Sequence, residues 1–216
     1  MFTPTREEFI RLSKKGNLIP VYRKILADFE TPLTSFMKID KGDYSFLLES
    51  VEGGRNLARY SFLGSSPSLV FSSSGGTVNI REGRITKTFA SKDPLEDLKA
   101  VIKRFAYVNV KGLPRFSGGL VGFLGYDMVR FMEKIPDKND DDLGVADCVF
   151  MLTDTMLIFD HVDRSIKIVS NAHIKGDPAK AYDEAVMKID RIYEDLKGRG
   201  KSAVPSFPVR RRTRAL

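Results

Sequence analysis

Residues 58–88 read ARYSFLGSSPSLVFSSSGGTVNIREGRITKT, a stretch in which short apolar runs alternate with glycine-containing turns. The runs predict strands at 58–63, 68–72, 77–81 and 84–88. The pairs Gly75-Gly76 and Glu82-Gly83 lie between the later runs, and two-residue turns of this kind join antiparallel neighbours. The stretch therefore predicts an antiparallel meander.

Further strands are expected on both sides of this meander. The patterns predict strands at 18–25, 44–51 and 118–125, and a hairpin of 149–160 with 165–170 that closes near Asp163. The 44–51 run is apolar and is bounded by glycines, so we expect this strand to be mostly buried. Regular strand–helix alternation is lacking, which favours an α+β fold with largely antiparallel β-sheets and flanking helices.

Three helix starts are marked by capping residues. Thr5-Arg6-Glu7-Glu8 fits a capping box and predicts a helix over 6–15. Asp93-Pro94 and Asp177-Pro178 each combine an acidic cap with proline at the first helical position. Apolar residues at three- to four-residue spacing follow both pairs, and residues 126–134 also have a helical pattern.

Length and composition indicate an ordinary globular protein. The chain has 216 residues, 42% of them hydrophobic and 29% charged, which suits one sizeable domain. No apolar run approaches the ~18 residues that cross a membrane, and the first residues lack a secretory pattern. The single cysteine, Cys148, cannot form an internal disulfide. We therefore expect a cytoplasmic protein without a membrane partner, with Cys148 buried.

The net charge of +7 comes from one end of the chain. Residues 197–216 carry seven lysines and arginines and no acid, so residues 1–196 hold 28 basic and 28 acidic residues. A nucleic-acid-binding domain would carry a basic face on its folded body. The sequence therefore predicts a neutral domain at 1–196, a basic, solvated and disordered tail at 197–216, and no nucleic-acid partner.

No catalytic or metal-binding motif stands out. The glycines at 118, 119, 122 and 125 match neither phosphate-binding pattern, and close backbone packing or a ligand against the sheet explains them better. His161, His173 and Cys148 lack metal-ligand spacing, and the acidic run 137–142 lacks the calcium-loop pattern. Asp160-His161 has no accompanying nucleophile elbow, so we expect His161 to hydrogen-bond at a strand end.

Glu49 and Ser50 place polar groups directly after the apolar pair Leu47-Leu48. A carboxylate, a hydroxyl and a cation such as Arg59 match the ammonium and carboxylate of a free amino acid. The residues alone leave a second interpretation open, in which Glu49 simply ends a strand in solvent.

Three segments carry a resemblance to a known family: Leu47-Leu48-Glu49-Ser50 with 58–64, then 116–130, then 154–161. In this order they resemble the amino-terminal half of anthranilate synthase component I and of its relative aminodeoxychorismate synthase, both chorismate-utilising enzymes. The resemblance runs from about Pro20 to about Leu196. It implies the amino-terminal part of the anthranilate/aminodeoxychorismate synthase fold.

The resemblance implies a role in tryptophan biosynthesis. Such enzymes convert chorismate and ammonia, which comes from glutamine, into anthranilate and pyruvate, and L-tryptophan inhibits them. Glu49, Ser50 and Arg59 would be the tryptophan-binding effector residues. The alternatives are the folate-pathway relative, a freestanding amino-acid-binding module, and an inactive remnant.

The resemblance also implies what this chain does not supply. The complete enzyme uses Mg²⁺ and a glutamine amidotransferase subunit, component II. The Mg²⁺ and acid–base residues belong to a chorismate-binding catalytic half that is absent here, so we expect no catalytic residue, metal ligand or cofactor in this chain. The resemblance stops near Lys201, which suggests a frameshift or a truncation. Without its other half, the chain is expected to expose apolar surface and self-associate.

Overall fold

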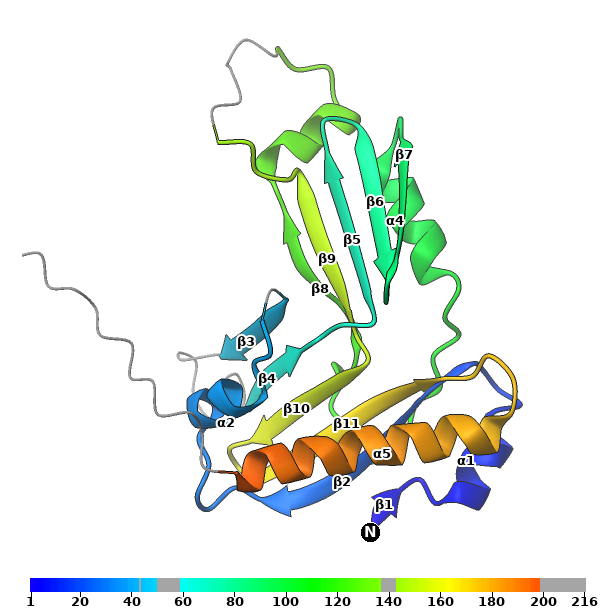
Figure 1. Cartoon of the computed structure of the whole chain (residues 1–216), viewed down its shortest axis with the longest axis vertical. Coiled ribbons are helices and arrows are strands. Elements are labelled where there is room, and N and C mark those ends of the chain that lie inside the picture. The colour runs from blue at the N-terminus through cyan, green and yellow to red at the C-terminus, as the bar shows by residue number, and fades with distance from the viewer. Residues whose placement is uncertain (43, 50–58, 137–142, 199–216) are drawn as a thin grey trace, which may run out of the picture.

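Two antiparallel sheets form the framework of the molecule (Figure 1). The structure is a computed structural model, and it describes residues 1–42, 44–49, 59–136 and 143–198. The six-stranded sheet has the order β1 (Phe2–Thr3), β2 (Leu18–Leu26), β11 (Ser165–His173), β10 (Thr155–Asp160), β4 (Tyr60–Ser65) and β3 (Ser45–Glu49). The five-stranded sheet has the order β7 (Ile85–Ala90), β6 (Thr77–Glu82), β5 (Leu69–Ser74), β9 (Cys148–Thr153) and β8 (Gly119–Leu124).

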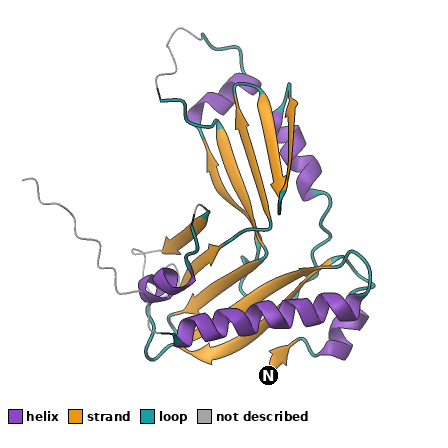
Figure 2. Cartoon of the chain, viewed as in Figure 1, coloured by secondary structure: helices purple, strands orange, loops and turns teal. Residues whose placement is uncertain are grey.

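Helices flank the two sheets (Figure 2). The α-helices are α1 (Arg6–Leu12), α2 (Pro32–Ile39), α4 (Pro94–Ile102) and α5 (Pro178–Lys197), and the 3-10 helix η1 spans Tyr126–Phe131. Side chains of Thr5, Asp93 and Asp177 accept hydrogen bonds from backbone amides of the first turns. All three predicted caps are therefore confirmed. The two antiparallel sheets with flanking helices confirm the predicted α+β fold class.

Three apolar clusters hold these layers together. The largest packs α1, α2 and α5 against one face of the six-stranded sheet and includes Phe9, Leu157, Ile168 and Ile189. A second packs α4 and η1 on the five-stranded sheet. The third covers the other face of the six-stranded sheet, around Met156 and Val169, and reaches Val121 of β8 and Met151 of β9. This third cluster joins the two sheets.

One predicted strand and the predicted meander turn out to be divided between the two sheets. The run 149–160 was expected to be one strand, but it breaks at Asp154 into β9 and β10. β9 pairs with β5 and β8, whereas β10 pairs with β4 and β11. In the predicted meander, β5, β6 and β7 pair in succession, but the first run is β4 of the other sheet. The single-strand expectation was wrong because the apolar pattern continues through the crossing point.

The expected burial of the 44–51 strand was also wrong. β3 lies at the edge of the six-stranded sheet and pairs only with β4, and 45% of Leu48 is exposed. Helix α2 was not expected either. Thr31 caps it in a capping box with Thr34, and Pro32 is in its first turn.

Glycine in β8 allows close contact between neighbouring backbones. A Cβ atom on Gly122 would lie 1.9 Å from the carbonyl oxygen of Val149 in β9, a distance at which the atoms overlap. Close packing is therefore the reason for this glycine, as one of the two sequence interpretations held. Cys148, at the start of β9, is fully buried as predicted.

Candidate functional site

The candidate site lies at one end of three neighbouring strands, β3, β4 and β10 (Figure 1). Glu49 is the last residue of β3, and its register partner on β4 is Ser61. Arg59 directly precedes β4, and Asp160 ends β10 opposite Tyr60. Antiparallel pairing thus brings residues about a hundred positions apart to the same end of the sheet.

Arg59 and Asp160 form a two-pronged ion pair. The guanidinium Nε donates to Oδ1 at 3.0 Å and Nη2 donates to Oδ2 at 2.8 Å. The Asp160 side chain is only 1% exposed, whereas that of Arg59 is 42% exposed. The backbone amide of Asp163 also donates to Asp160 Oδ1 at 3.2 Å, and Lys167 Nζ lies 3.8 Å from Oδ2. The buried carboxylate therefore fixes the direction of a half-exposed cation.

These contacts decide the protonation of Asp160. Burial by itself would raise the pKa of the carboxyl, because the charged form loses hydration. The hydrogen bonds from Arg59 and from the Asp163 amide, with the charges of Arg59 and Lys167, outweigh burial and hold the pKa of Asp160 below its usual value. The same pairing raises the pKa of Arg59. Both groups are charged at neutral pH.

A second polar group surrounds Ser61, which is buried in β4. Ser61 Oγ lies 2.8 Å from His161 Nε2 and donates to Glu49 Oε1 at 3.4 Å. The His161 backbone amide donates to the Arg59 carbonyl oxygen at 2.9 Å. His161 therefore hydrogen-bonds at a strand end, as the sequence predicted. The carboxylate contacts the hydroxyl and not the imidazole, so this arrangement lacks the order of a catalytic triad and suits polar recognition.

The predicted effector residues are placed as follows. Glu49 and Arg59 lie at the same end of the sheet, but each contacts a different partner. Ser50 lies outside the described residues. Sequence reasoning missed the role of Ser61, although the alternation of strand β4 puts it on the same face as its register partner Glu49.

The site still has hydrogen-bonding capacity for a ligand. A guanidinium has five N–H donors, and Asp160 takes one from each of Nε and Nη2. The remaining donors belong to a side chain that is close to half exposed. Glu49 is exposed, and its carboxylate can accept further hydrogen bonds. A cation and an anion thus lie at neighbouring strand ends, an arrangement that can bind a zwitterion.

Metal binding finds no support in the part of the chain that the structure describes. Among residues 1–42, 44–49, 59–136 and 143–198, no three His, Cys, Asp or Glu side chains are grouped so that they could hold an ion. The acidic run 137–142 lies outside the described residues. In the same part of the chain, every helix is too short or too polar to cross a membrane.

Comparison with known proteins identifies relatives of similar sequence. No family model matches it. It is 40% identical over 196 residues to anthranilate synthase component 1 of Acetivibrio thermocellus, and 38% identical over 195 residues to that of Aquifex aeolicus. The chain is homologous to the amino-terminal part of anthranilate synthase component 1. The matches cover 91% and 90% of this chain and 40% of each relative.

A solved structure of anthranilate synthase component I agrees with this relationship. The protein from Streptococcus pneumoniae TIGR4 aligns with a TM-score of 0.56 and 25% identity, over 82% of this chain and 37% of its own. Its shared architecture confirms the predicted fold. The chain spans about 40% of the length of the anthranilate synthase components that it matches in sequence.

Proposed function

We propose that this chain supplies the scaffold and the L-tryptophan feedback site of an anthranilate synthase component I. The complete enzyme would convert chorismate and ammonia, derived from glutamine, into anthranilate and pyruvate. The observation that carries the proposal is the placing of Glu49 and Arg59 at one end of β3 and β4, in a chain 36–40% identical to several anthranilate synthase components.

L-tryptophan would bind through its two charged groups, which are complementary to Glu49 and Arg59. The ammonium group would pair with Glu49, which Ser61 orients through its hydroxyl. The carboxylate would take the donors of Arg59 that Asp160 leaves free. Asp160 is then a positioning residue, since its two bonds fix the plane of the guanidinium. Ser50 belongs to the proposed site through the resemblance alone.

Tryptophan binding can be followed directly, because the chain contains no tryptophan. L-tryptophan is titrated with the full 216-residue chain while the indole fluorescence of the ligand is recorded. We expect saturable binding that weakens at least tenfold in Glu49→Gln, which loses the charge and keeps the size. Glu133→Gln is the matched control, because Glu133 is exposed on the five-stranded-sheet side of the molecule. Equal affinity in both variants contradicts the proposed site.

The folate-pathway relative is the second candidate, and growth assays separate the two. The chain is produced together with the remaining part of the Acetivibrio thermocellus relative, in strains that lack either component I. Rescue without added tryptophan supports the anthranilate enzyme, and rescue without added p-aminobenzoate supports the alternative. Tryptophan binding without any rescue supports a freestanding amino-acid-binding module. Neither binding nor rescue indicates an inactive remnant.

The partners follow from the same proposal. The relatives are named as component 1 of the synthase, and we propose a glutamine amidotransferase subunit as component II. Chorismate, Mg²⁺ and the acid–base groups would belong to the remaining length of the relatives, which would dock on the exposed edges β3 and β8. A cytoplasmic location is part of the proposal and is supported by the buried, unpaired Cys148.

A further inference from the structure

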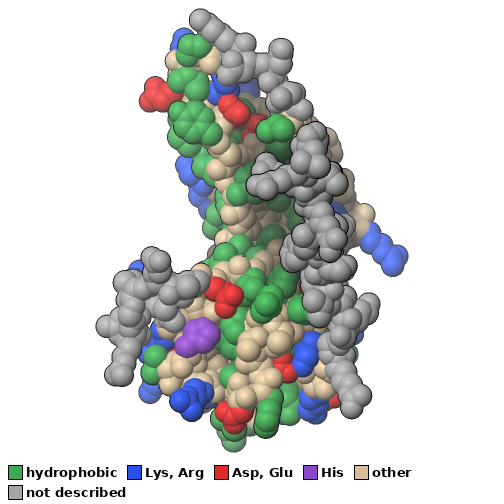
Figure 3. Space-filling model, turned by 90° about the vertical axis from the view of Figure 1, so that its left-hand side faces the viewer, with side chains coloured by type: hydrophobic (Ala, Val, Ile, Leu, Met, Phe, Trp, Pro, Cys, Tyr) green, Lys and Arg blue, Asp and Glu red, His purple; other side chains and the backbone are tan. Residues whose placement is uncertain are grey.

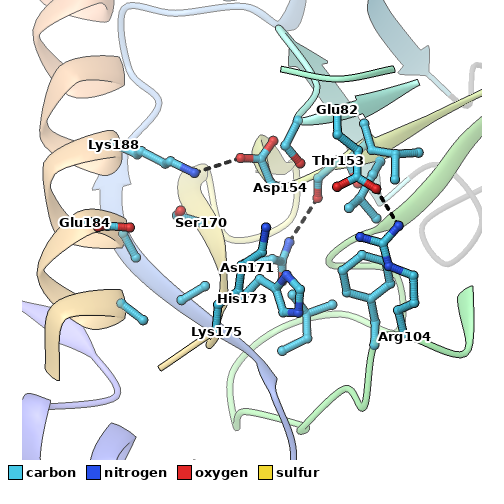
Figure 4. Close-up of a pocket in the computed structure, with 18 of the residues that line it drawn as sticks. Glu82, Arg104, Thr153, Asp154, Ser170, Asn171, His173, Lys175, Glu184 and Lys188 are labelled. Carbon is cyan, nitrogen blue, oxygen red and sulfur yellow. Dashed lines mark hydrogen bonds and ion pairs between the residues drawn. The ribbon is translucent and has the colours of Figure 1, made fainter. Parts of the chain in front are cut away.

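A cavity of about 830 Å³ lies at the opposite end of the six-stranded sheet from Glu49 (Figure 4). In the β10–β11 ladder, Asp160 pairs with Ser165 at the end near the candidate effector site, and Thr155 pairs with Ser170 at the cavity end. The walls come from the first half of α5, the last residues of β11, and the adjoining ends of β6 and β9. This volume is within the range of small-molecule sites.

Two buried oxygen atoms in the cavity wall have no hydrogen-bond partner among the described residues. These are Ser170 Oγ and Asn171 Oδ1, on residues that are 1% and 3% exposed. The Asn171 amide nitrogen donates to the carbonyl oxygens of Ser117, at 2.9 Å, and Thr153, at 3.2 Å. Both partners are acceptors, so the nitrogen must face them and Oδ1 is the free end. Buried polar atoms are normally paired, so two unpaired oxygens on residues that line the cavity call for a partner.

Two of the cations that line the cavity have no ion-pair partner in the described part of the chain. Four basic residues line it, and two of them are engaged: Lys188 Nζ lies 2.8 Å from Asp154 Oδ2, and Arg104 pairs with Glu82. Lys175 and Lys180 form no ion pair within the described part of the chain.

Acidic residues and one histidine also line the cavity. Asp177 caps α5, where its charge meets the positive end of the helix. Glu184 lies about two turns further along the same helix. Burial, followed by the charges of Lys175 and Arg104, lowers the pKa of His173, while Glu82 acts in the opposite direction. Lys175 is therefore an unpaired positive charge near His173, whereas the charge of Arg104 is paired with Glu82.

Apolar side chains give the cavity room for a carbon skeleton. Leu18, Leu69, Leu152 and Phe105 line it, and the Phe105 ring lies 4.8 Å from the His173 ring, centroid to centroid. An apolar wall with a few convergent polar groups is the usual composition of a small-molecule site.

We propose that this cavity is a second binding site, for a small organic anion that carries both a carboxylate and a hydroxyl or amino group. The carboxylate pairs with Lys175 and Lys180. The hydroxyl or amino group donates to Asn171 Oδ1, and Ser170 Oγ donates to a ligand oxygen. The site is independent of the proposed tryptophan site, which lies at the other end of the sheet.

The test is an NMR titration of the full 216-residue chain labelled with ¹⁵N. The probes are L-malate, succinate, inorganic phosphate and glycerol, because malate differs from succinate by a single hydroxyl. We expect saturable shifts of backbone amides in 170–188 with malate, and at least fivefold weaker binding of succinate. No saturable shifts with any of the three anions overturns the proposal. So does phosphate binding without malate binding, or glycerol binding as tightly as malate.

Two variants locate the binding in the cavity. Lys175→Met and Ser170→Ala should each weaken malate binding at least threefold. Lys134→Met is the control, because Lys134 is exposed and does not line the cavity, and it should leave malate binding unchanged. Thermal melting checks that each variant folds. Tryptophan affinity should be the same in Lys175→Met as in the parent chain, which separates this site from the feedback site. Unchanged malate affinity in both cavity variants overturns the assignment.

Discussion

Asp160 is the most buried charged group of the candidate effector site, and it contacts Arg59, Lys167 and the backbone of Asp163. Asp160→Asn keeps the shape of the side chain and removes the charge that both cations face. We expect the free energy of unfolding at pH 7 to fall by about 1–3 kcal/mol. Urea denaturation measures the change. Asp183→Asn, which breaks an exposed pair with Arg6, is the control and should cost less than Asp160→Asn, because solvent screens exposed pairs.

The pH dependence of this difference gives a second readout of the same residue. Because the folded-state pKa of Asp160 is lowered, the folded protein holds this proton less tightly than the unfolded chain does. The stabilisation is therefore complete above the unfolded pKa of about 3.9 and is lost as the pH falls through the folded value. The difference in the free energy of unfolding between the parent chain and Asp160→Asn should therefore decrease at acidic pH. A gap that stays constant from pH 7 to pH 3 contradicts this account of the ion pair.

His173 should make stability depend on pH in a different window. Burial and two nearby cations lower its pKa, so in the folded state the proton binds only below the unfolded value of about 6.5. Its contribution to the free energy of unfolding is complete above that value and declines as the pH falls through the folded pKa.

The ring proton signals of the two histidines can be titrated by NMR. The His173 midpoint is expected below 6.5. The decrease in the free energy of unfolding that protonation of His173 causes at low pH should disappear in His173→Gln. It should persist in His161→Gln. A His173 midpoint at or above 6.5 contradicts the burial and charge argument.

At the scale of elements, the sequence predicted those whose signals are local. The capping residues Thr5, Asp93 and Asp177 marked three helix starts, and glycine turns separated β5, β6 and β7. Helix α2 was missed because its capping box pairs Thr31 with Thr34 and lacks the glutamate that marked the start of α1. The division of 148–160 at Asp154 was missed because the apolar pattern does not change where the chain passes between sheets. Pairing partners decide that boundary, and they lie far away in sequence.

The β8–β9 pair offers a direct test of close backbone packing. In Gly122→Ala the added methyl group would overlap the Val149 carbonyl, which belongs to the backbone and cannot rotate away. We expect a loss of about 1–3 kcal/mol in the free energy of unfolding, the usual cost of overpacking. Gly176→Ala is the control, because the space around its Cβ position is open. Equal unfolding midpoints for the two variants contradict the predicted overlap.

The whole molecule depends on contacts between distant parts of the chain, and here sequence reasoning reached its limit. The Asn171 amide of β11 donates to the carbonyl oxygens of Ser117, just before β8, and of Thr153, at the end of β9, and so ties the two sheets together. The Arg59–Asp160 pair joins residues 101 positions apart. The sequence identified Glu49 and Arg59 as a candidate pair, but not the partners that orient them, because no local pattern records a contact across three strands.

Two of the four edge strands of the sheets expose apolar side chains on one side of the molecule. β3 and β8 are edge strands of different sheets and lie on the same side of the molecule, with exposed apolar side chains that include Leu48, Phe123 and Leu124. Hydrophobic side chains are visible between the two sheets on that side (Figure 3). Unpaired strand edges with apolar side chains favour association with other chains.

We therefore expect the purified chain to self-associate at micromolar concentration, because a second copy can cover these edges. Sedimentation velocity should show species larger than the 24.3 kDa monomer, with a fraction that grows with concentration. Phe123→Lys places a charge on the β8 edge and should shift the distribution toward monomer. Met187→Lys alters an exposed apolar residue of α5, away from both edges, and should leave it unchanged. A monomer at all concentrations, without binding of a hydrophobic dye, would show that these edges are protected.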